Sequence, residues 1–140
     1  MPEKSTTPDL VELWRRSAEA WNSGDFDGAM SMFSPNPVWD ATGVGLFVYQ
    51  GHAAIRQYLV EWMGFLDDVH HEVEEIVDLG HGITFGVVST TGRMKGSNGE
   101  LDMRWAAVAE WPDGLTTRVT VYTDIDEGRT TAERLARERS

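Results

Sequence analysis

The chain has 140 residues, of which 41% are hydrophobic and 25% charged, and a formal net charge of −11. This size and composition are typical of one globular domain, so we expect residues 1–140 to form a single unit. The negative charge argues against nucleic acid or an anionic membrane as a partner, since both attract basic surfaces. The sequence has no cysteine, which excludes disulfides, thiolate chemistry and cysteine-ligated metals.

No stretch of the sequence is apolar enough over a sufficient length to span a bilayer. The first residues, MPEKSTTPDL, are polar and contain no apolar signal core. We therefore expect no membrane partner and a cytoplasmic location, with residues 1–6 as a flexible lead.

Three helices are predicted in the first half of the chain. Apolar residues recur at helical spacing over 8–22, and Thr7-Pro8 supplies a hydroxyl cap followed by proline at the first helical position. A second, shorter helix begins after Asp25, and a third covers about 52–66. A short strand over 38–41 separates the second helix from the third.

From residue 69 onward the apolar pattern changes to period two. Strands are predicted over 69–79, 83–94, 101–111 and 115–123, joined by turns rich in glycine or containing Pro-Asp-Gly. Residues 124–140 are expected to form a polar helical tail. Helices followed by a meander of strands predict an α+β fold in which the helices cover one face of a curved sheet.

The stretch PVWDATGVGLFVYQG, residues 37–51, carries the first candidate for chemistry. Asp40 ends a short apolar strand and precedes an apolar connection that glycines interrupt. An acid beside exposed hydrophobic residues is typical of a small-molecule pocket, and burial raises the pKa of such a carboxyl toward values useful for proton transfer. We therefore predict that Asp40 is a general acid or base. The alternative is an aspartate that caps the backbone of its own turn at Thr42 and Gly43.

His71 is the second candidate, because it shares the more apolar face of its predicted strand with two valines and with Glu75. It could pair with Asp40 inside the same pocket. The alternation is imperfect here, so His70 remains the alternative inward residue. The histidines and acids have no metal-ligand spacing, and no glycine-rich turn has the context of a phosphate loop. No metal and no cofactor are therefore predicted.

The order helix, helix, strand, helix and four long strands resembles the nuclear transport factor 2-like superfamily, and within it the SnoaL-like and ketosteroid-isomerase-like proteins. The resemblance rests on AWNSGDFDGAMSMF, VWDATG and YQGHAAIRQYL, and it extends over about residues 8–124. It implies a cone-shaped α+β barrel, in which a curved antiparallel sheet wraps around a long N-terminal helix and encloses an apolar cavity. It also implies a homodimer formed through the outer face of the sheet.

The resemblance places Asp40 where ketosteroid isomerases keep their general-base aspartate. The two other isomerase positions do not match, because their tyrosine corresponds to Ser17 and their second aspartate to Ala107. Val121 stands where epoxide hydrolases of this fold have an acid in the last strand. Without these groups a steroid isomerase or a limonene-type hydrolase is not expected.

The predicted function is a small-molecule enzyme (isomerase, cyclase, dehydratase or hydrolase) that acts on a hydrophobic substrate, with Asp40 as acid or base and His71 as its partner. The alternative is a non-catalytic ligand-binding protein that uses the same cavity. Asp102 and Arg104 are expected on the face of the sheet opposite to Trp105, in cross-strand ion pairs at the dimer surface. The residues expected to wall the pocket are Trp14, Ser17, Trp21, Tyr58, Trp62, Phe85, Trp105 and Val119.

Overall fold

The computed structural model describes residues 9–140, apart from the side chains of Trp62 and Met63. The expected lead over residues 1–6 and the Thr7-Pro8 helix start lie outside the described residues. The helices are α1 (Leu10–Asn22), α2 (Phe26–Met30), α3 (His52–Phe65) and α4 (Ile125–Glu138). The strands are β1 (Phe33–Gly43), β2 (Val48–Gln50), β3 (Leu66–Asp78), β4 (Ile83–Met94), β5 (Glu100–Glu110) and β6 (Thr116–Tyr122).

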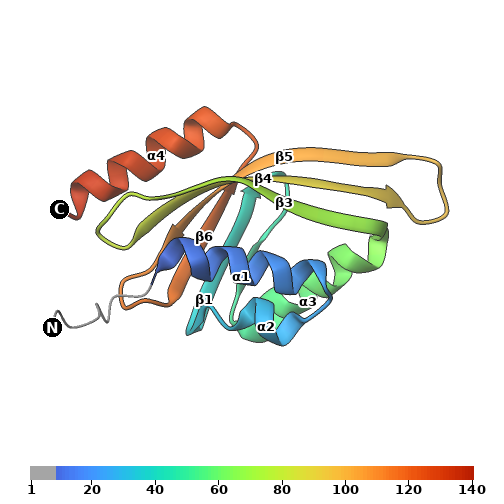
Figure 1. Ribbon diagram of the computed structural model, residues 1–140, viewed down its shortest axis with the longest axis horizontal. Coiled ribbons are helices and arrows are strands. Elements are labelled where there is room, and N and C mark those ends of the chain that lie inside the picture. The colour runs from blue at the N-terminus through green and yellow to red at the C-terminus, as the bar shows by residue number, and fades with distance from the viewer. Residues whose placement is uncertain (1–8) are drawn as a thin grey trace, which may run out of the picture.

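The strands form one curved sheet in the order β2-β1-β6-β5-β4-β3. Helices α1, α2 and α3 lie on one side of this sheet, and α4 lies on the other (Figure 1). The expected cone of a curved sheet over the first helix is confirmed, although the sheet stays open. It is also mixed, because β1 pairs with β6 in parallel while the other neighbours are antiparallel.

Three helices begin at an aspartate whose side chain accepts a hydrogen bond from a backbone N–H of the first turn. Asp9 caps α1, Asp25 caps α2 as predicted, and Asp124 caps α4, at distances of 3.2, 2.9 and 3.0 Å. Such caps satisfy N–H groups that have no partner within the helix.

Strand β1 is longer than the predicted 38–41, because it begins at Phe33 and runs through Pro35 and Pro37. Its register against β6 shifts between Phe33 and Val38. Proline cannot donate to a strand ladder, and the irregular register accommodates Pro35 and Pro37.

The sheet is buried on both sides at β4 and β5. The core on the α1–α3 side contains alternate residues of these strands, among them Val88, Trp105, Ala107 and Ala109. The core on the α4 side contains the residues between them together with two alanines of the helix: Ile83, Phe85, Val87, Ala106, Val108, Ala132 and Ala136.

Helix α4 packs closely on the sheet at Gly128. A Cβ added there would lie 3.1 Å from the Cβ of Ala106 and 3.4 Å from Phe85, so the glycine permits the close approach. The next residue, Arg129, lies over the Phe85 ring at 4.6 Å from the ring centroid and donates to both carboxylate oxygens of Glu75 at 3.0 and 2.8 Å. The expectation that Phe85 walls the pocket is therefore corrected, because its side chain lies on the other face of the sheet.

The segment expected as a polar tail is thus a docked helix with a buried stripe of Gly128, Ala132 and Ala136. It covers the sheet face through which the resemblance implied dimerisation. The homodimer stays a prediction, and a second copy approaching this side would meet α4.

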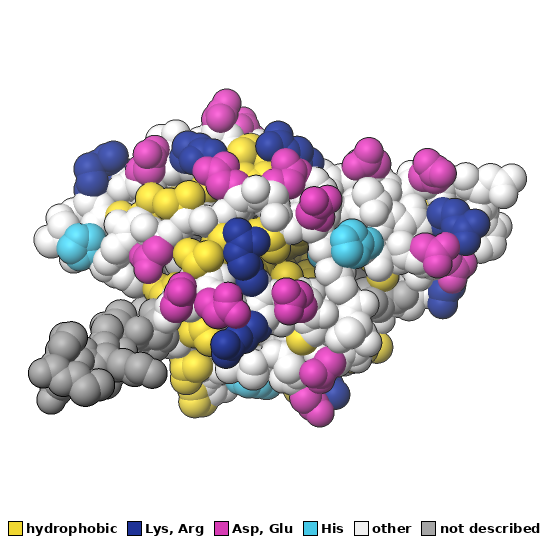
Figure 2. Space-filling view, in the orientation of Figure 1, with side chains coloured by type: hydrophobic (Ala, Val, Ile, Leu, Met, Phe, Trp, Pro, Cys, Tyr) yellow, Lys and Arg dark blue, Asp and Glu magenta, His cyan; other side chains and the backbone are white. Residues whose placement is uncertain are grey.

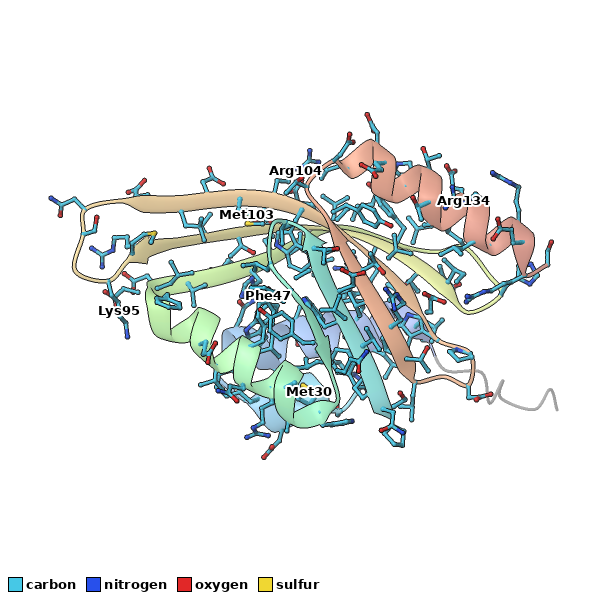
Figure 3. All side chains as sticks on the ribbon, turned by 180° about the vertical axis from the view of Figure 1, so that it is seen from behind. Met30, Phe47, Lys95, Met103, Arg104 and Arg134 are labelled. Carbon is cyan, nitrogen blue, oxygen red and sulfur yellow. The ribbon has the colours of Figure 1, made fainter. Side chains whose placement is uncertain are left out.

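On the face shown in Figure 2, charged side chains of both signs are interspersed. The predicted opposition of faces on β5 is confirmed, because Met103 lies on the side of α1–α3 and Arg104 on the side of α4 (Figure 3). Arg104 pairs with Glu74 of β3 at 3.0 Å. Within residues 9–140, no helix combines the length and the apolar character that crossing a membrane requires.

Candidate functional site

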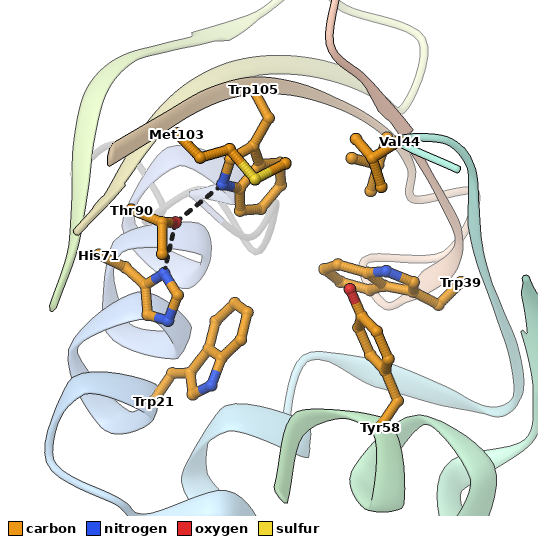
Figure 4. A pocket seen from close by; sticks show the side chains of 9 residues that line it. Trp21, Trp39, Val44, Tyr58, His71, Thr90, Met103 and Trp105 are labelled. Carbon is orange, nitrogen blue, oxygen red and sulfur yellow. Dashed lines mark hydrogen bonds between the residues drawn. The ribbon is translucent and has the colours of Figure 1, made fainter. Parts of the chain in front are cut away.

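A small chamber lies between the sheet and helices α1 and α3 (Figure 4). Its volume is about 30 Å³. Its walls come from all of these elements and from the β1–β2 connection: Trp21, Trp39, Val44, Tyr58, His71, Thr90, Met103, Trp105 and Val121.

Aromatic rings form most of these walls, and Trp39 is at their centre. Its ring centroid lies 6.5 Å from Trp21, 6.0 Å from Tyr58 and 6.4 Å from Trp105. The planes are inclined by 89°, 43° and 63° respectively, so the pairs with Trp21 and Trp105 have the edge-to-face arrangement that aromatic rings favour, and the pair with Tyr58 is tilted. The chamber therefore presents a closely packed aromatic wall.

His71 is the titratable imidazole of this wall, and it is only 6% exposed. Its Nδ1 lies 2.8 Å from the Thr90 hydroxyl, which also accepts a hydrogen bond from the indole N–H of Trp105 at 2.9 Å (Figure 4). Thr90 faces His71 because the two residues are partners in the β3–β4 ladder. One hydroxyl thus joins two side chains of the chamber.

The chemistry of these groups fixes where the imidazole proton lies. The indole N–H of Trp105 can only donate, so Thr90 must accept from it. The buried Thr90 hydroxyl needs an acceptor for its own hydrogen, and Nδ1 of His71 is within reach. The network is satisfied when Thr90 donates to Nδ1, which leaves the proton of neutral His71 on Nε2. This Nε2 is buried and has no hydrogen-bond partner among the described residues.

Burial lowers the pKa of His71 from its usual 6.5 to about 4, and the charge of neighbouring His70 acts in the same direction. His71 is therefore neutral at pH 7. Its backbone is held by Asn22, the last residue of α1, through two hydrogen bonds of 2.7 Å. The strand and the helix together fix the ring.

Asp40 does not line the chamber. Trp39 and Ala41 of β1 point into the core, so by the period of a strand Asp40 points out. Its carboxylate accepts from the Thr42 N–H at 3.0 Å, from the Thr42 hydroxyl at 2.6 Å and from Arg118 at 2.8 Å. These contacts, led by the Thr42 hydroxyl, lower the pKa of Asp40.

The expectation of a carboxyl in an apolar pocket with a raised pKa is therefore corrected for Asp40. The alternative of an aspartate that caps its own turn describes the geometry. Asp40 and His71 are not brought together, and of the two His71 is the one inside.

Three of the residues expected to wall the pocket line the chamber with His71, namely Trp21, Tyr58 and Trp105. Three more are buried on the same side of the sheet without lining it, namely Trp14, Ser17 and Val119. The Ser17 hydroxyl donates to the backbone oxygen of Ala29 at 2.8 Å. The Trp62 side chain lies outside the described residues.

The sequence interpretation missed several lining residues: Trp39, Thr90, Met103 and Val121. Alternation along the strand offered a signal for Trp39. Neighbouring residues of a strand point to opposite faces, so a buried Trp39 requires an outward Asp40. No comparable signal existed for Thr90. Its pairing with His71 depends on a register shift between Val73 and Glu75.

A second, larger hollow lies next to the chamber, and we call it the outer groove. Its volume is about 310 Å³, and Tyr58 lines both hollows. The residues that line the groove are Leu46, Tyr49, Tyr58, Glu61, Phe65, Leu66, Met94 and Leu101. Phe65 and Met94 are 65% and 46% exposed, so the groove opens to solvent beside apolar side chains.

The fold and the chamber define a class: a small cone-like α+β protein whose sheet and helices enclose an apolar hollow. The profile of the SnoaL-like domain family matches residues 14–119, and the chain belongs to this family. No curated protein sequence matches it.

Solved structures share this fold over most of the chain. A protein with a ketosteroid isomerase-like fold from Catenulispora acidiphila DSM 44928, in complex with trimethylamine, is 16% identical with a TM-score of 0.70, over 91% of this chain and 94% of its own. A protein from Jannaschia sp. CCS1, provisionally named a SnoaL-like polyketide cyclase, is 14% identical with a TM-score of 0.73, over 95% and 98%. TerC, co-crystallised with polyporic acid, is 17% identical with a TM-score of 0.70, over 88% and 97%.

Proposed function

We propose that the protein binds a neutral, apolar small molecule that reaches into the chamber, where an oxygen of this molecule accepts a hydrogen bond from Nε2 of His71. One observation carries the proposal: a buried, neutral imidazole stands among aromatic rings with its N–H donor unpaired. Buried polar groups in native proteins nearly always have a partner. A ligand oxygen would supply that partner.

The charge of the ligand follows from the charge of its surroundings. His71 is neutral at pH 7, and the other residues that line the chamber carry no charge. A carboxylate or an ammonium group would be buried without an opposite charge, which is strongly unfavourable. A neutral molecule meets no such penalty.

The unpaired polar atoms around the chamber favour an oxygen acceptor. Among the described residues that line it, the buried polar atoms without a partner are Nε2 of His71 and the indole nitrogens of Trp21 and Trp39. An indole nitrogen only donates, and so does Nε2 in the tautomer derived above. A ketone, ether or epoxide brings acceptors and no donor, and therefore complements this set.

The comparisons support a small organic ligand. Two of the similar structures contain one, trimethylamine in the first and polyporic acid in TerC. Asp40 has no part in this proposal, because its carboxylate is engaged by Thr42 and Arg118.

Catalysis is the second candidate, and one feature favours it. An N–H donor held in a fixed position in an apolar site stabilises negative charge that develops on a substrate oxygen. His71 would then promote enolisation of a ketone, with the α-proton passing to a base in solvent. Deuterium exchange at the methyl group of acetophenone in D₂O, compared between the wild type and His71→Phe, measures this directly.

Binding is tested with acetophenone and ethylbenzene, which have similar shapes and differ in the carbonyl oxygen. Quenching of tryptophan fluorescence reports both affinities. One hydrogen bond predicts that acetophenone binds about 3- to 10-fold more tightly. His71→Phe is expected to abolish this preference, while the control His70→Phe, at an exposed neighbour, keeps it. A preference that persists in His71→Phe, or is absent from the wild type, overturns the proposal.

A further inference from the structure

We propose that the chamber and the outer groove are two parts of one binding site, separated by the side chain of Tyr58. The site takes an extended neutral ketone, with its carbonyl in the chamber and its apolar chain along the groove. The carbonyl end rests on the proposed function. The shared site and the chain-binding groove rest on separate observations.

The chamber alone is too small to hold an organic ligand. About 30 Å³ accommodates one or two water molecules, whereas small-molecule pockets in proteins measure about 300–1,000 Å³. The outer groove, at about 310 Å³, reaches that range. An organic ligand that contacts His71 must therefore extend into the groove.

One strand forms a continuous floor beneath both hollows. Leu101, Met103 and Trp105 are alternate residues of β5, whose ladder with β4 is unbroken, so they share one face of the sheet. Leu101 lines the groove, and Met103 and Trp105 line the chamber. The path from Leu101 to Trp105 measures about 13 Å at the rise of a strand.

The β1–β2 connection continues from one hollow to the other in the same way. Val44 lines the chamber, and Leu46, two residues later, lines the groove. The apolar sequence of this connection, first noted as a candidate pocket wall, thus serves both compartments.

Tyr58 stands between the two compartments. On the groove side its ring stacks on Tyr49, with centroids 4.5 Å apart and planes inclined by 29°. On the chamber side it lies 6.0 Å from Trp39 (Figure 4). Among the described lining residues it alone belongs to both hollows. In this proposal, movement of the Tyr58 ring joins the chamber and the outer groove.

The chemistry of the groove selects the ligand. Its lining is apolar or aromatic except for Glu61, and the chain carries a net charge of −11. An anionic ligand such as a fatty acid is therefore disfavoured, because Glu61 and the negative net charge repel it. A neutral chain also covers the exposed Phe65 and Met94 and removes their apolar surface from water.

The test uses a series of methyl ketones, 2-hexanone, 2-octanone and 2-undecanone, and tryptophan fluorescence as the readout. Each methylene that enters the groove is expected to raise the affinity about two- to fourfold, with a plateau where the chain reaches the rim. Leu101→Gln places an amide on the groove floor and is expected to lower the affinity for 2-undecanone at least fivefold more than that for 2-hexanone.

Leu115→Gln is the matched control, since it makes the same replacement at a 41% exposed leucine that lines neither hollow. Thermal melting verifies that both variants are folded. Affinity that does not depend on chain length, absence of binding by 2-undecanone, or equal effects of the two leucine variants overturns the shared site.

The same series separates this inference from the proposed function. His71→Phe is expected to weaken all three ketones by a similar factor, because it acts on the carbonyl end. Length dependence without an effect of His71 refutes the carbonyl contact and leaves the groove, whereas an effect of His71 without length dependence refutes the groove alone.

Discussion

The imidazole of His71 stacks on the indole of Trp21, with ring centroids 3.8 Å apart and planes inclined by 26°. Trp21 lies in the last turn of α1, and the next residue, Asn22, holds the backbone of His71. The chamber is therefore built at the junction of the first helix and strand β3. A positive charge on His71 would be buried there, so protonation opposes folding.

The first prediction is a pH dependence of stability. The pKa of His71 is about 4 in the folded protein and about 6.5 when unfolded, so the unfolded chain binds the proton more tightly. The contribution of neutral His71 to the free energy of unfolding is fully present above the pKa of the unfolded chain. It decreases as the pH falls from 6.5 toward 4. Between pH 7 and pH 5 the loss from this group is about 2 kcal/mol.

Urea unfolding at the two pH values measures this loss. His71→Phe, which cannot be protonated, is expected to lose about 2 kcal/mol less than the wild type over the same interval. Equal pH dependence in the two proteins would show that the imidazole is already solvated in the folded state.

The second prediction concerns the hydroxyl of Thr90. Thr90→Val keeps the shape of the side chain but leaves Nδ1 of His71 and the indole N–H of Trp105 without partners. Each buried, unpaired group costs about 1–3 kcal/mol, so we expect a total loss of about 2–6 kcal/mol in the free energy of unfolding. Thr90→Ser retains the hydroxyl and is expected to lose less. Similar losses in both variants would contradict the bridging role.

The third prediction concerns Asp40, which was the leading catalytic candidate from sequence. Asp40→Asn is expected to leave the acetophenone affinity within about twofold of the wild type, because the side chain points away from the chamber. Its ion pair with Arg118 is partly exposed, so the stability loss is expected to be about 1 kcal/mol or less. Retained acetophenone binding together with loss of deuterium exchange at its methyl group would restore Asp40 as a catalytic base.

The fourth prediction concerns the docking of α4. Gly128→Leu forces a side chain against Ala106 and Phe85, and overpacking of this kind costs about 1–3 kcal/mol. Thr130→Leu is the control, because it lies on the exposed side of the same helix. Chemical unfolding compares the two. A Gly128→Leu protein as stable as Thr130→Leu would mean that α4 is not held against the sheet.

Much of the fold could be predicted because its signals are local. The predicted strand over 83–94 coincides with β4, and the cap at Asp25 begins α2 as expected. These features follow from turn residues and from the period of apolar side chains. The parallel pairing of β1 with β6 joins segments far apart in sequence and has no local signal.

The site was harder to predict, because it depends on which face of each strand is inward. Both faces of β4 are buried, so burial along the strand could not show that Phe85 faces α4. Glu75 was expected to share the face of His71, but the register shift after Val73 turns it toward Arg129. His71 precedes that shift, and its predicted inward position is confirmed.

The central claim is that His71 is neutral, protonated on Nε2, and donates to a ligand oxygen in the chamber. Long-range ¹⁵N–¹H NMR spectra of the histidine rings test it most directly, recorded from pH 5 to pH 8 and then with 2-undecanone added. We predict one imidazole that keeps its proton on Nε2 throughout this range and whose Nε2 resonance shifts when the ketone binds. If the His71 imidazole titrates near pH 6.5, carries its proton on Nδ1 or does not respond to the ketone, the account is contradicted.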